Sequence, residues 1–282
     1  MPPEGHGVTP PVAMTIAGSD SGAGAGLQAD LKTFAALGVF ATTVVTAVTA
    51  QSTRTVAGVE PVAPEFVALQ IETVLDDMPV AAVKTGMLAS SAVVGVVAEL
   101  AARGRLPNLV VDPVLLSSTG HPLLDPGGAD AYRTLLCPRA RVFTPNLREA
   151  AFLLGVEPAA IADVDAMADA ARRLRALGPD TVVVKGGHLG GDASPDVVAT
   201  DAGITVVDKA RIRTANDHGT GCSLSAAIAA GLARGLPVPD AVAGAQAYVA
   251  RALAGAARWR LGAGRGPLDH FGWGEVGGPR QA

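Results

Sequence analysis

Short runs of β-branched residues alternate along this chain with longer runs rich in alanine and leucine. Six of the short runs are almost entirely apolar and have the length of strands: 12–17, 42–48, 81–84, 109–112, 141–144 and 181–185. Strands that are apolar at nearly every position are typical of parallel sheets covered by helices on both faces. The alternation therefore predicts an α/β fold of three layers, with a doubly wound, mostly parallel sheet in the middle.

The segments between these strands have the composition of helices, at 26–37, 64–77, 90–103, 127–135, 147–154 and 163–177. Beyond residue 185 the pattern changes, and 197–200 and 204–207 flank a short turn, which predicts a small antiparallel hairpin at the sheet edge. Two further helices are predicted at 222–234 and 240–261. Because no linker divides the chain, we expect one domain over 12–273, with flexible ends at 1–11 and 274–282.

Composition and charge argue against several classes of protein. With 49% hydrophobic and 17% charged residues, the chain can build a large core and is not intrinsically disordered. Its net charge of −4 argues against a nucleic-acid partner. Residues 1–11 do not resemble a signal peptide, and the apolar stretch at 41–50 is too short to span a bilayer. Together these features predict no membrane partner. The two cysteines, Cys137 and Cys222, are too few for a disulfide framework and favour a reducing compartment, so we expect a cytoplasmic protein.

The segment His218-Gly219-Thr220-Gly221-Cys222-Ser223 leads into a predicted helix. The first N–H groups of a helix and the positive end of its dipole attract anions, and the two glycines let an anion approach the backbone. Cys222 lies at the same point, where we expect its thiolate to be favoured. Taken alone, this segment would be interpreted as an ordinary glycine-rich helix cap. The polar segments elsewhere in the chain favour an anion site instead.

Polar or glycine-rich segments follow all six predicted strands, at 18–26, 51–53, 85–87, 112–120, 145–149 and 186–188. Ligands of such sheets bind outside the carboxyl ends of the strands, so these segments are expected to meet. Asp112 and Glu149, with Asn146 nearby, suit Mg²⁺ shared with substrate phosphates. Lys185, at the end of a valine-rich strand, can stabilise the charge on a phosphate during transfer.

Each of these residues also has an ordinary structural interpretation. Asp112 can cap a turn, Glu149 can complement a helix dipole, and Lys185 can extend from the strand end into water. His218 and His188 are equally well explained as phosphate donors or as turn residues. Their combination with the anion site favours the handling of metal and phosphate.

The first glycine-rich segment, 18–26, superficially matches a dinucleotide-binding motif. The acidic residue that should end the second strand is missing, because Gln51 and Ser52 stand there, and a loop that closes over a small substrate fits better. Asp30, one turn into the next helix, either accepts a hydrogen bond from a ligand amine or is a solvated surface carboxylate. The chain has no P-loop motif, so any phosphoryl transfer is of another type.

In this order, the segments resemble those of the ribokinase-like superfamily and, within it, of the bacterial hydroxymethylpyrimidine/phosphomethylpyrimidine kinases. The resemblance extends over residues 12–271 and rests on 16–21, 24–33, 46–53, 84–88, 111–114, 144–150, 184–188 and 218–223. The segments 28–33 and 218–222 are specific to this branch, since most sugar kinases of the superfamily have Asp where Cys222 stands.

The resemblance implies a kinase of thiamine biosynthesis that phosphorylates 4-amino-5-hydroxymethyl-2-methylpyrimidine and then its monophosphate, with ATP as donor, Mg²⁺ as cofactor and a homodimer as the assembly. It also implies roles for individual residues. These are pyrimidine contacts by Gly18, Asp30, Gln51, Met87 and Val114; catalysis by Gly219, Thr220, Gly221, Cys222 and Lys185; nucleotide contacts by Asn146, Lys185 and His218; and metal binding by Asp112 and Glu149.

Three alternatives stay open on the sequence. A pyridoxine or pyridoxal kinase can use the same scaffold. A non-catalytic pyrimidine-binding protein would keep Gly18, Asp30 and Gln51 but would not need the anion site. A Cys222–His218 pair for acyl transfer is the least favoured, because it leaves the acidic residues unexplained.

Overall fold

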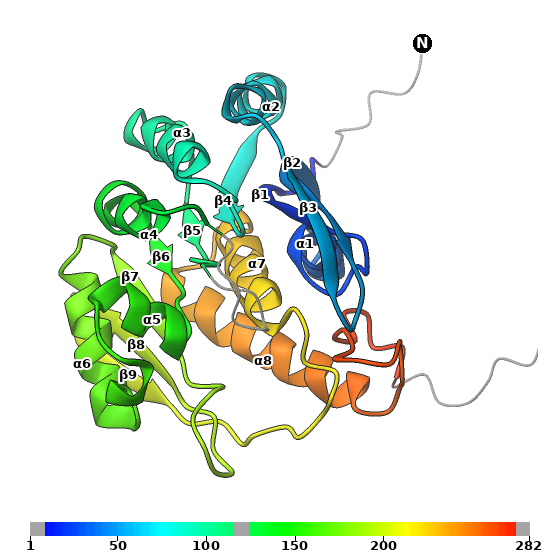
Figure 1. The fold of residues 1–282 in the computed structure, drawn as a ribbon, viewed down its shortest axis with the longest axis vertical. Helices are drawn as coiled ribbons and strands as arrows, with labels where there is room; N and C mark the ends of the chain where they lie inside the picture. Colours follow the sequence, from blue (N-terminus) through cyan, green and yellow to red (C-terminus); the bar gives the residue numbers. More distant parts are fainter. Residues whose placement is uncertain (1–8, 116–123, 275–282) are drawn as a thin grey trace, which may run out of the picture.

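A computed structural model describes residues 9–115 and 124–274 of the chain. Within these residues nine strands form one sheet in the order β3-β2-β1-β4-β5-β6-β7-β8-β9 (Figure 1). The six central strands, β2-β1-β4-β5-β6-β7, pair in parallel with their neighbours. They are β1 (Val12–Asp20), β2 (Phe40–Gln51), β4 (Val80–Thr85), β5 (Val110–Val111), β6 (Val142–Phe143) and β7 (Thr181–Lys185). This is the predicted mostly parallel sheet.

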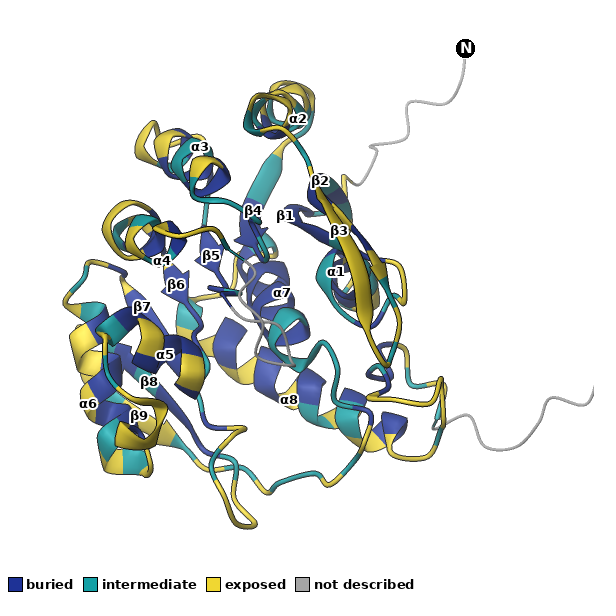
Figure 2. Cartoon of the chain, in the orientation of Figure 1, coloured by how far each residue is buried: buried dark blue, intermediate teal, exposed yellow. Residues whose placement is uncertain are grey.

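Both edges of the sheet are antiparallel. At one edge β8 (Asp196–Thr200) and β9 (Gly203–Val207) form the predicted hairpin. At the other edge β3 (Val56–Pro61) pairs with β2, and this strand was not predicted. A run of six residues with a glycine and a terminal proline does not look like a strand, but both residues are tolerated at an edge, and β3 is exposed along its whole length (Figure 2).

Helices cover both faces of the sheet, as predicted (Figure 1). One layer contains α2 (Pro64–Asp77), α3 (Ser91–Ala102), α4 (Gly128–Ala131), α5 (Leu147–Leu154) and α6 (Val164–Arg175). The other contains α1 (Gly26–Ala36), α7 (Thr220–Ala233) and α8 (Val238–Ala256). In the described ranges no helix is both long and apolar enough to cross a membrane.

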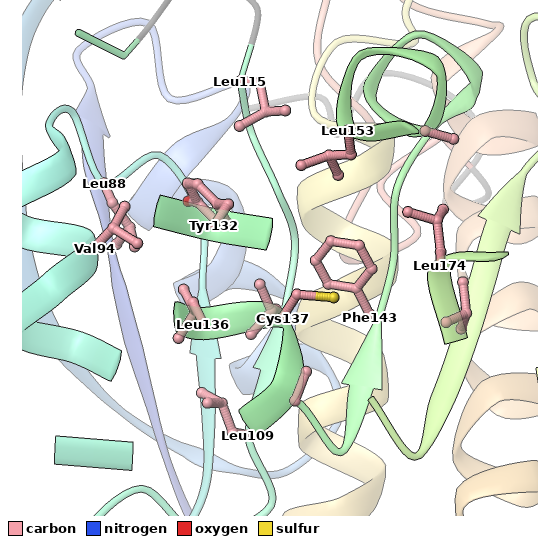
Figure 3. Packing of buried hydrophobic residues seen from close by; sticks show 14 of the residues in the cluster. Leu88, Val94, Leu109, Leu115, Tyr132, Leu136, Cys137, Phe143, Leu153 and Leu174 are labelled. Carbon is pink, nitrogen blue, oxygen red and sulfur yellow. The ribbon is translucent and has the colours of Figure 1, made fainter. Parts of the chain in front are cut away.

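The two cores follow the alternation of side chains along each strand. In β7, Val182 and Val184 pack with the first helical layer, whereas Val183 packs with the second. The first core contains the large side chains around Tyr132 and Phe143 (Figure 3), and the Tyr132 hydroxyl donates to the carbonyl of Gly86, 3.1 Å away. Because only 4% of the residues are aromatic, the second core consists mainly of alanine, valine and leucine.

Two predicted helices have different bounds in the structure. The helix predicted at 127–135 is interrupted, because α4 ends at Ala131 and the chain continues as a wider π-helical stretch, Tyr132–Leu136, and a short 3-10 turn, Cys137–Arg139. The last helix ends at Ala256 rather than at 261. There the Asn216 side chain donates to the carbonyls of Ala256 and Trp259, at 2.7 and 2.8 Å, and so terminates the helix.

Candidate active site

Two neighbouring cavities lie at the carboxyl ends of the parallel strands, on either side of the start of α7. The larger has a volume of about 560 Å³ and is bordered by the ends of β1, β2 and β4. The smaller, of about 330 Å³, lies between the end of β7, the hairpin strand β8 and the helices α7 and α8. Seven residues line both: Asn146, Glu149, Lys185, His218, Gly219, Gly221 and Arg265.

The loop that begins α7, which the sequence predicts to bind an anion, separates the two cavities. Gly219, immediately before the helix, has a φ of +87°, and a Cβ there would lie 1.9 Å from the carbonyl oxygen of Gly24. The Thr220 hydroxyl donates to the carbonyl of Asp217 at 2.7 Å. Only glycine combines a positive φ with the absence of a Cβ, so Gly219 is what allows the close contact with the first glycine-rich loop.

Asp20, which the sequence reasoning did not single out, organises the first glycine-rich loop. Its carboxylate accepts the N–H groups of Gly22, Gly24 and Ala25 at 2.8–3.0 Å. Burial opposes ionisation, but His218 and these N–H groups hold the pKa of Asp20 below its usual value. The signal for this residue was present in the sequence, since an aspartate before a run of glycines is typical of a turn in which its side chain binds the backbone.

His218 connects this loop to the end of β2. Its Nε2 lies 3.2 Å from Asp20 Oδ2 and 3.2 Å from Gln51 Nε2. His218 therefore contacts Asp20 and Gln51, and within the described residues it forms no hydrogen bond to Cys222. This arrangement argues against the acyl-transfer pair considered from the sequence.

Lys185, Asp112 and Glu149 meet at the boundary of the cavities, as the strand ends predicted. Lys185 Nζ is 2.7 Å from Asp112 Oδ1 and 3.9 Å from Glu149 Oε2. Asn146 caps α5 with its side-chain oxygen, and its N–H donates to Glu149 Oε2 at 2.7 Å. Burial raises the pKa of Glu149 to about 8, although Lys185 opposes the increase. One cation thus lies against two buried carboxyl groups.

Asp30 is not on the wall of either cavity, and it is not a solvated carboxylate either. Its side chain is fully buried, accepts the Thr15 hydroxyl at 2.6 Å and forms an ion pair with Lys84, whose Nζ lies 2.7 Å away. Burial favours the neutral lysine, but the contact with Asp30 raises the pKa of Lys84 above its usual value. Lys84 borders the larger cavity, and the sequence reasoning missed it.

Cys222 also borders the larger cavity, as does Gly26 at the start of α1. Burial raises the pKa of its thiol to about 11; Lys84 lowers the pKa, whereas Asp30 and Asp112 raise it further. The prediction that this position favours the thiolate is therefore wrong for the unliganded protein. The helix dipole is outweighed by burial and by two neighbouring carboxylates.

The other predicted residues are placed as follows. The larger cavity is lined by four of the five predicted pyrimidine contacts and by both predicted metal ligands: Gly18, Gln51, Met87, Val114, Asp112 and Glu149. Thr220 lines the smaller cavity but not the larger one. The structure therefore brings together all the predicted site residues except Asp30, and it adds Asp20, Lys84 and Arg265 to the same region.

Comparisons with known proteins agree with this architecture. A family model described as phosphomethylpyrimidine kinase matches residues 20–269. The hydroxymethylpyrimidine/phosphomethylpyrimidine kinase of Rhizobium meliloti (strain 1021) is 47% identical over 261 residues, which cover 92% of this chain and 97% of the relative.

Solved structures of two related enzymes are also similar. The phosphomethylpyrimidine kinase of Clostridium difficile 630 has a TM-score of 0.76 and 38% identity, covering 86% of this chain and 99% of its own. The pyridoxal kinase of Staphylococcus aureus in complex with AMP-PCP and pyridoxal has a TM-score of 0.84 and 34% identity, covering 94% and 95%. These matches confirm the resemblance inferred from the motifs, and the chain belongs to the phosphomethylpyrimidine kinase family.

Proposed function

We propose that this chain transfers the γ-phosphoryl group of ATP to the hydroxymethyl group of 4-amino-5-hydroxymethyl-2-methylpyrimidine, and then phosphorylates the monophosphate to the diphosphate, in thiamine biosynthesis. The observation that carries the proposal is the meeting of two cavities at the loop that begins α7. An acceptor in one cavity and a donor in the other would place the transferring group against Gly219 and Gly221. The Rhizobium relative is named for both phosphorylations.

The larger cavity supports a small aromatic acceptor. Met87 and Val114 give it apolar walls, and Gln51 offers an amide that can both donate to and accept from an aminopyrimidine edge. A Cβ at Gly18 would lie 2.4 Å from Cε of Met87, so this glycine keeps the methionine side chain in place beside the ring position. Shape and polarity thus both favour a flat ring with hydrogen-bonding groups.

The boundary between the cavities supports phosphoryl transfer. In the transition state charge spreads over the oxygens of the moving group, and the residues around it act mainly by electrostatic stabilisation. The N–H groups at the start of α7 and the Lys185 ammonium supply this stabilisation. Because burial raises the pKa of the Cys222 thiol to about 11, the thiol is protonated at pH 7. The proposal therefore assigns most of the rate to the loop and Lys185.

The same boundary fits Mg²⁺. Within the described residues no three carboxylate, histidine or cysteine side chains form a cluster that would hold a metal ion by themselves. Mg²⁺ characteristically uses one or two carboxylates and completes its shell with water and phosphate oxygens. Asp112 and Glu149 are the residues that would hold it, and when bound it would neutralise phosphate charge. The expected cytoplasmic location and homodimer likewise belong to this proposal.

A pyridoxal kinase is the second candidate, and one observation favours it. The Staphylococcus aureus pyridoxal kinase was solved with pyridoxal and superposes with a TM-score of 0.84. The higher identity to the Rhizobium pyrimidine kinase, 47% against 34%, supports the pyrimidine as the main substrate.

The test is an assay of ATP consumption with hydroxymethylpyrimidine, its monophosphate and pyridoxal in parallel. We expect the two pyrimidines to have the higher kcat/KM values. A preference for pyridoxal would assign the chain to the second candidate. Calorimetric binding of the pyrimidine without any ATP consumption would instead indicate a non-catalytic binding protein.

A pair of glycine substitutions tests whether activity depends on the loop that begins α7. Gly219 and Gly235 have nearly the same backbone conformation, with φ of +87° and +82°, but only at Gly219 would a Cβ meet another atom within 4 Å. We expect Gly219→Ala to lower kcat by at least about 10²-fold, since it displaces the loop that binds the phosphoryl group. Gly235→Ala, the matched control, should cost only about 1 kcal/mol of stability. Equal kcat values in the two variants would contradict the role of the loop.

A further inference from the structure

Arg265 lies at the boundary of the two cavities and has had no role so far. We propose that its guanidinium binds the phosphate group of the monophosphate acceptor, and so determines how well the enzyme performs its second phosphorylation. The inference deepens the proposed function and rests on it. The class of ligand is a phosphate monoester attached to a small ring.

The backbone that carries Arg265 is fixed against the loop that begins α7. The N–H of His218 donates to the carbonyl of Gly266 at 3.0 Å, and the N–H of Gly266 donates to Ala215 at 3.1 Å. A Cβ at Gly266 would lie 1.9 Å from the side-chain oxygen of Asn216, so the two segments contact each other closely. Arg265 is therefore anchored beside the anion site, although its side chain is half exposed, at 49%.

Asp217 orients the guanidinium. Its Oδ1 accepts a hydrogen bond from Nε of Arg265 at 2.8 Å, and its Oδ2 lies 2.8 Å from Nη2 in the same ion pair. The backbone carbonyl of Asp217 accepts the Thr220 hydroxyl, so one residue holds both the arginine and the first turn of α7. A guanidinium has five N–H bonds, and in the described part of the chain the remaining three donate to no other residue. Those three N–H bonds suit the oxygens of a phosphate.

The other cations of the larger cavity are less suited to this ligand. Arg54 lines the larger cavity but not the smaller one, so it does not lie at the boundary where the phosphoryl group would be transferred. Lys84 is sealed beneath the cavity in its ion pair with Asp30, and Lys185 already lies against Asp112 and Glu149. The alcohol substrate is neutral and needs no such partner. The monophosphate carries nearly two negative charges at pH 7, and its phosphate must lie between the ring and the donor, at the boundary of the two cavities where Arg265 is placed.

The test compares the two acceptors in Arg265→Gln and in a matched control, Arg213→Gln. Arg213 is also exposed and paired with an aspartate, Asp192, but it borders neither cavity. We expect Arg265→Gln to lower kcat/KM for the monophosphate about tenfold, mainly through KM, and to leave the alcohol and ATP within about twofold, as for loss of a charged hydrogen bond. Arg265→Lys, which keeps the charge, should recover part of the loss.

Two results would overturn the inference. An unchanged ratio of the two acceptors in Arg265→Gln would remove Arg265 from substrate recognition. An equal loss with both acceptors, together with a higher KM for ATP, would assign it to the donor instead. If the wild-type enzyme phosphorylates neither pyrimidine, the proposed function itself is wrong. The wild-type assay therefore distinguishes that outcome from a failure of the Arg265 inference alone. Thermal unfolding of each variant verifies that the fold is kept.

Discussion

Two lysine–aspartate pairs in this protein have the same length and different surroundings. Lys84 and Asp30 are 2.7 Å apart, as are Lys185 and Asp112. Both lysines point towards the layer of α1, α7 and α8, because each stands two residues after a strand residue of that core, Ala82 or Val183. Lys84 lies one residue before the end of β4, beneath α1, whereas Lys185 is the last residue of β7.

This shift of one position along the strand separates a pair buried beneath α1 from a pair at the two cavities of the candidate active site. The Lys84 pair is fully buried, and within the described part of the chain its aspartate has a single further partner, the Thr15 hydroxyl. Lys185 is 12% exposed, faces both cavities and has a second carboxylate, Glu149, at 3.9 Å. We infer that the first pair stabilises the fold beneath the substrate, while the second exchanges partners when phosphates bind.

The largest expected effect is on stability, in Lys84→Met. This substitution leaves the Asp30 carboxylate buried without its cation, which should lower the free energy of unfolding by about 3–5 kcal/mol. Urea denaturation measures the change. In Lys84→Met/Asp30→Asn both charges are gone, so most of the loss should be recovered. If Lys84→Met alone lowers the free energy of unfolding by less than about 1 kcal/mol, the Lys84–Asp30 pair does not stabilise the fold.

Lys185→Met is expected to act mainly on the reaction. We expect kcat to fall by about 10²–10³-fold, or about 3–4 kcal/mol, because a cation at the transferring group is lost. The loss of stability should be smaller than in Lys84→Met, since Asp112 keeps hydrogen bonds from the Thr144 and Ser225 hydroxyls, at 3.2 and 3.3 Å. Steady-state kinetics and urea denaturation of both lysine variants test the contrast. A fall in kcat of less than tenfold for Lys185→Met would mean that the two pairs do not differ in function.

The comparison also explains which parts of the site were predictable. Asp112, Glu149 and Lys185 follow strands of a parallel sheet, and topology alone brings such residues to one edge. The partner of Asp30 depends on how α1 packs across β1 and β4, and no local pattern encodes that packing. For the same reason β3 and Arg265 were missed: an exposed edge strand has no apolar pattern, and Arg265 enters the site only through contacts between residues 215–218 and 265–267.

Another buried ionisable group, His270, has no counter-charge in hydrogen-bonding contact among the described residues and should respond to pH. Its Nε2 lies 2.9 Å from the Ser223 hydroxyl, next to Cys222. Burial lowers the pKa of His270 to about 4, and the Lys32 charge adds to the decrease. Because the unfolded state binds the proton first, this contribution to stability is complete above about pH 6.5 and is lost as the pH falls towards 4.

We therefore expect His270→Gln to reduce the pH dependence of unfolding. Between pH 7 and pH 5 the wild type should lose on the order of 1–2 kcal/mol more than the variant, measured by urea denaturation at each pH. Glutamine keeps an amide that can bond to Ser223, which makes it the appropriate replacement. Parallel curves for the two proteins would show that His270 does not titrate in this range.

The smallest expected effect concerns Cys222, which lies near both pairs. Burial raises the pKa of its thiol to about 11, with smaller contributions from Asp30 and Asp112 and with Lys84 opposing them, so the thiol stays protonated at neutral pH. Cys222→Ala should consequently lower kcat by no more than about tenfold. A general base would cost about 10²–10⁴-fold, and a loss of that size would mean that bound substrates ionise the thiol. The rate of alkylation by iodoacetamide against pH, with and without substrates, measures the ionisation directly and decides between a residue that moves a proton and one that shapes the pocket.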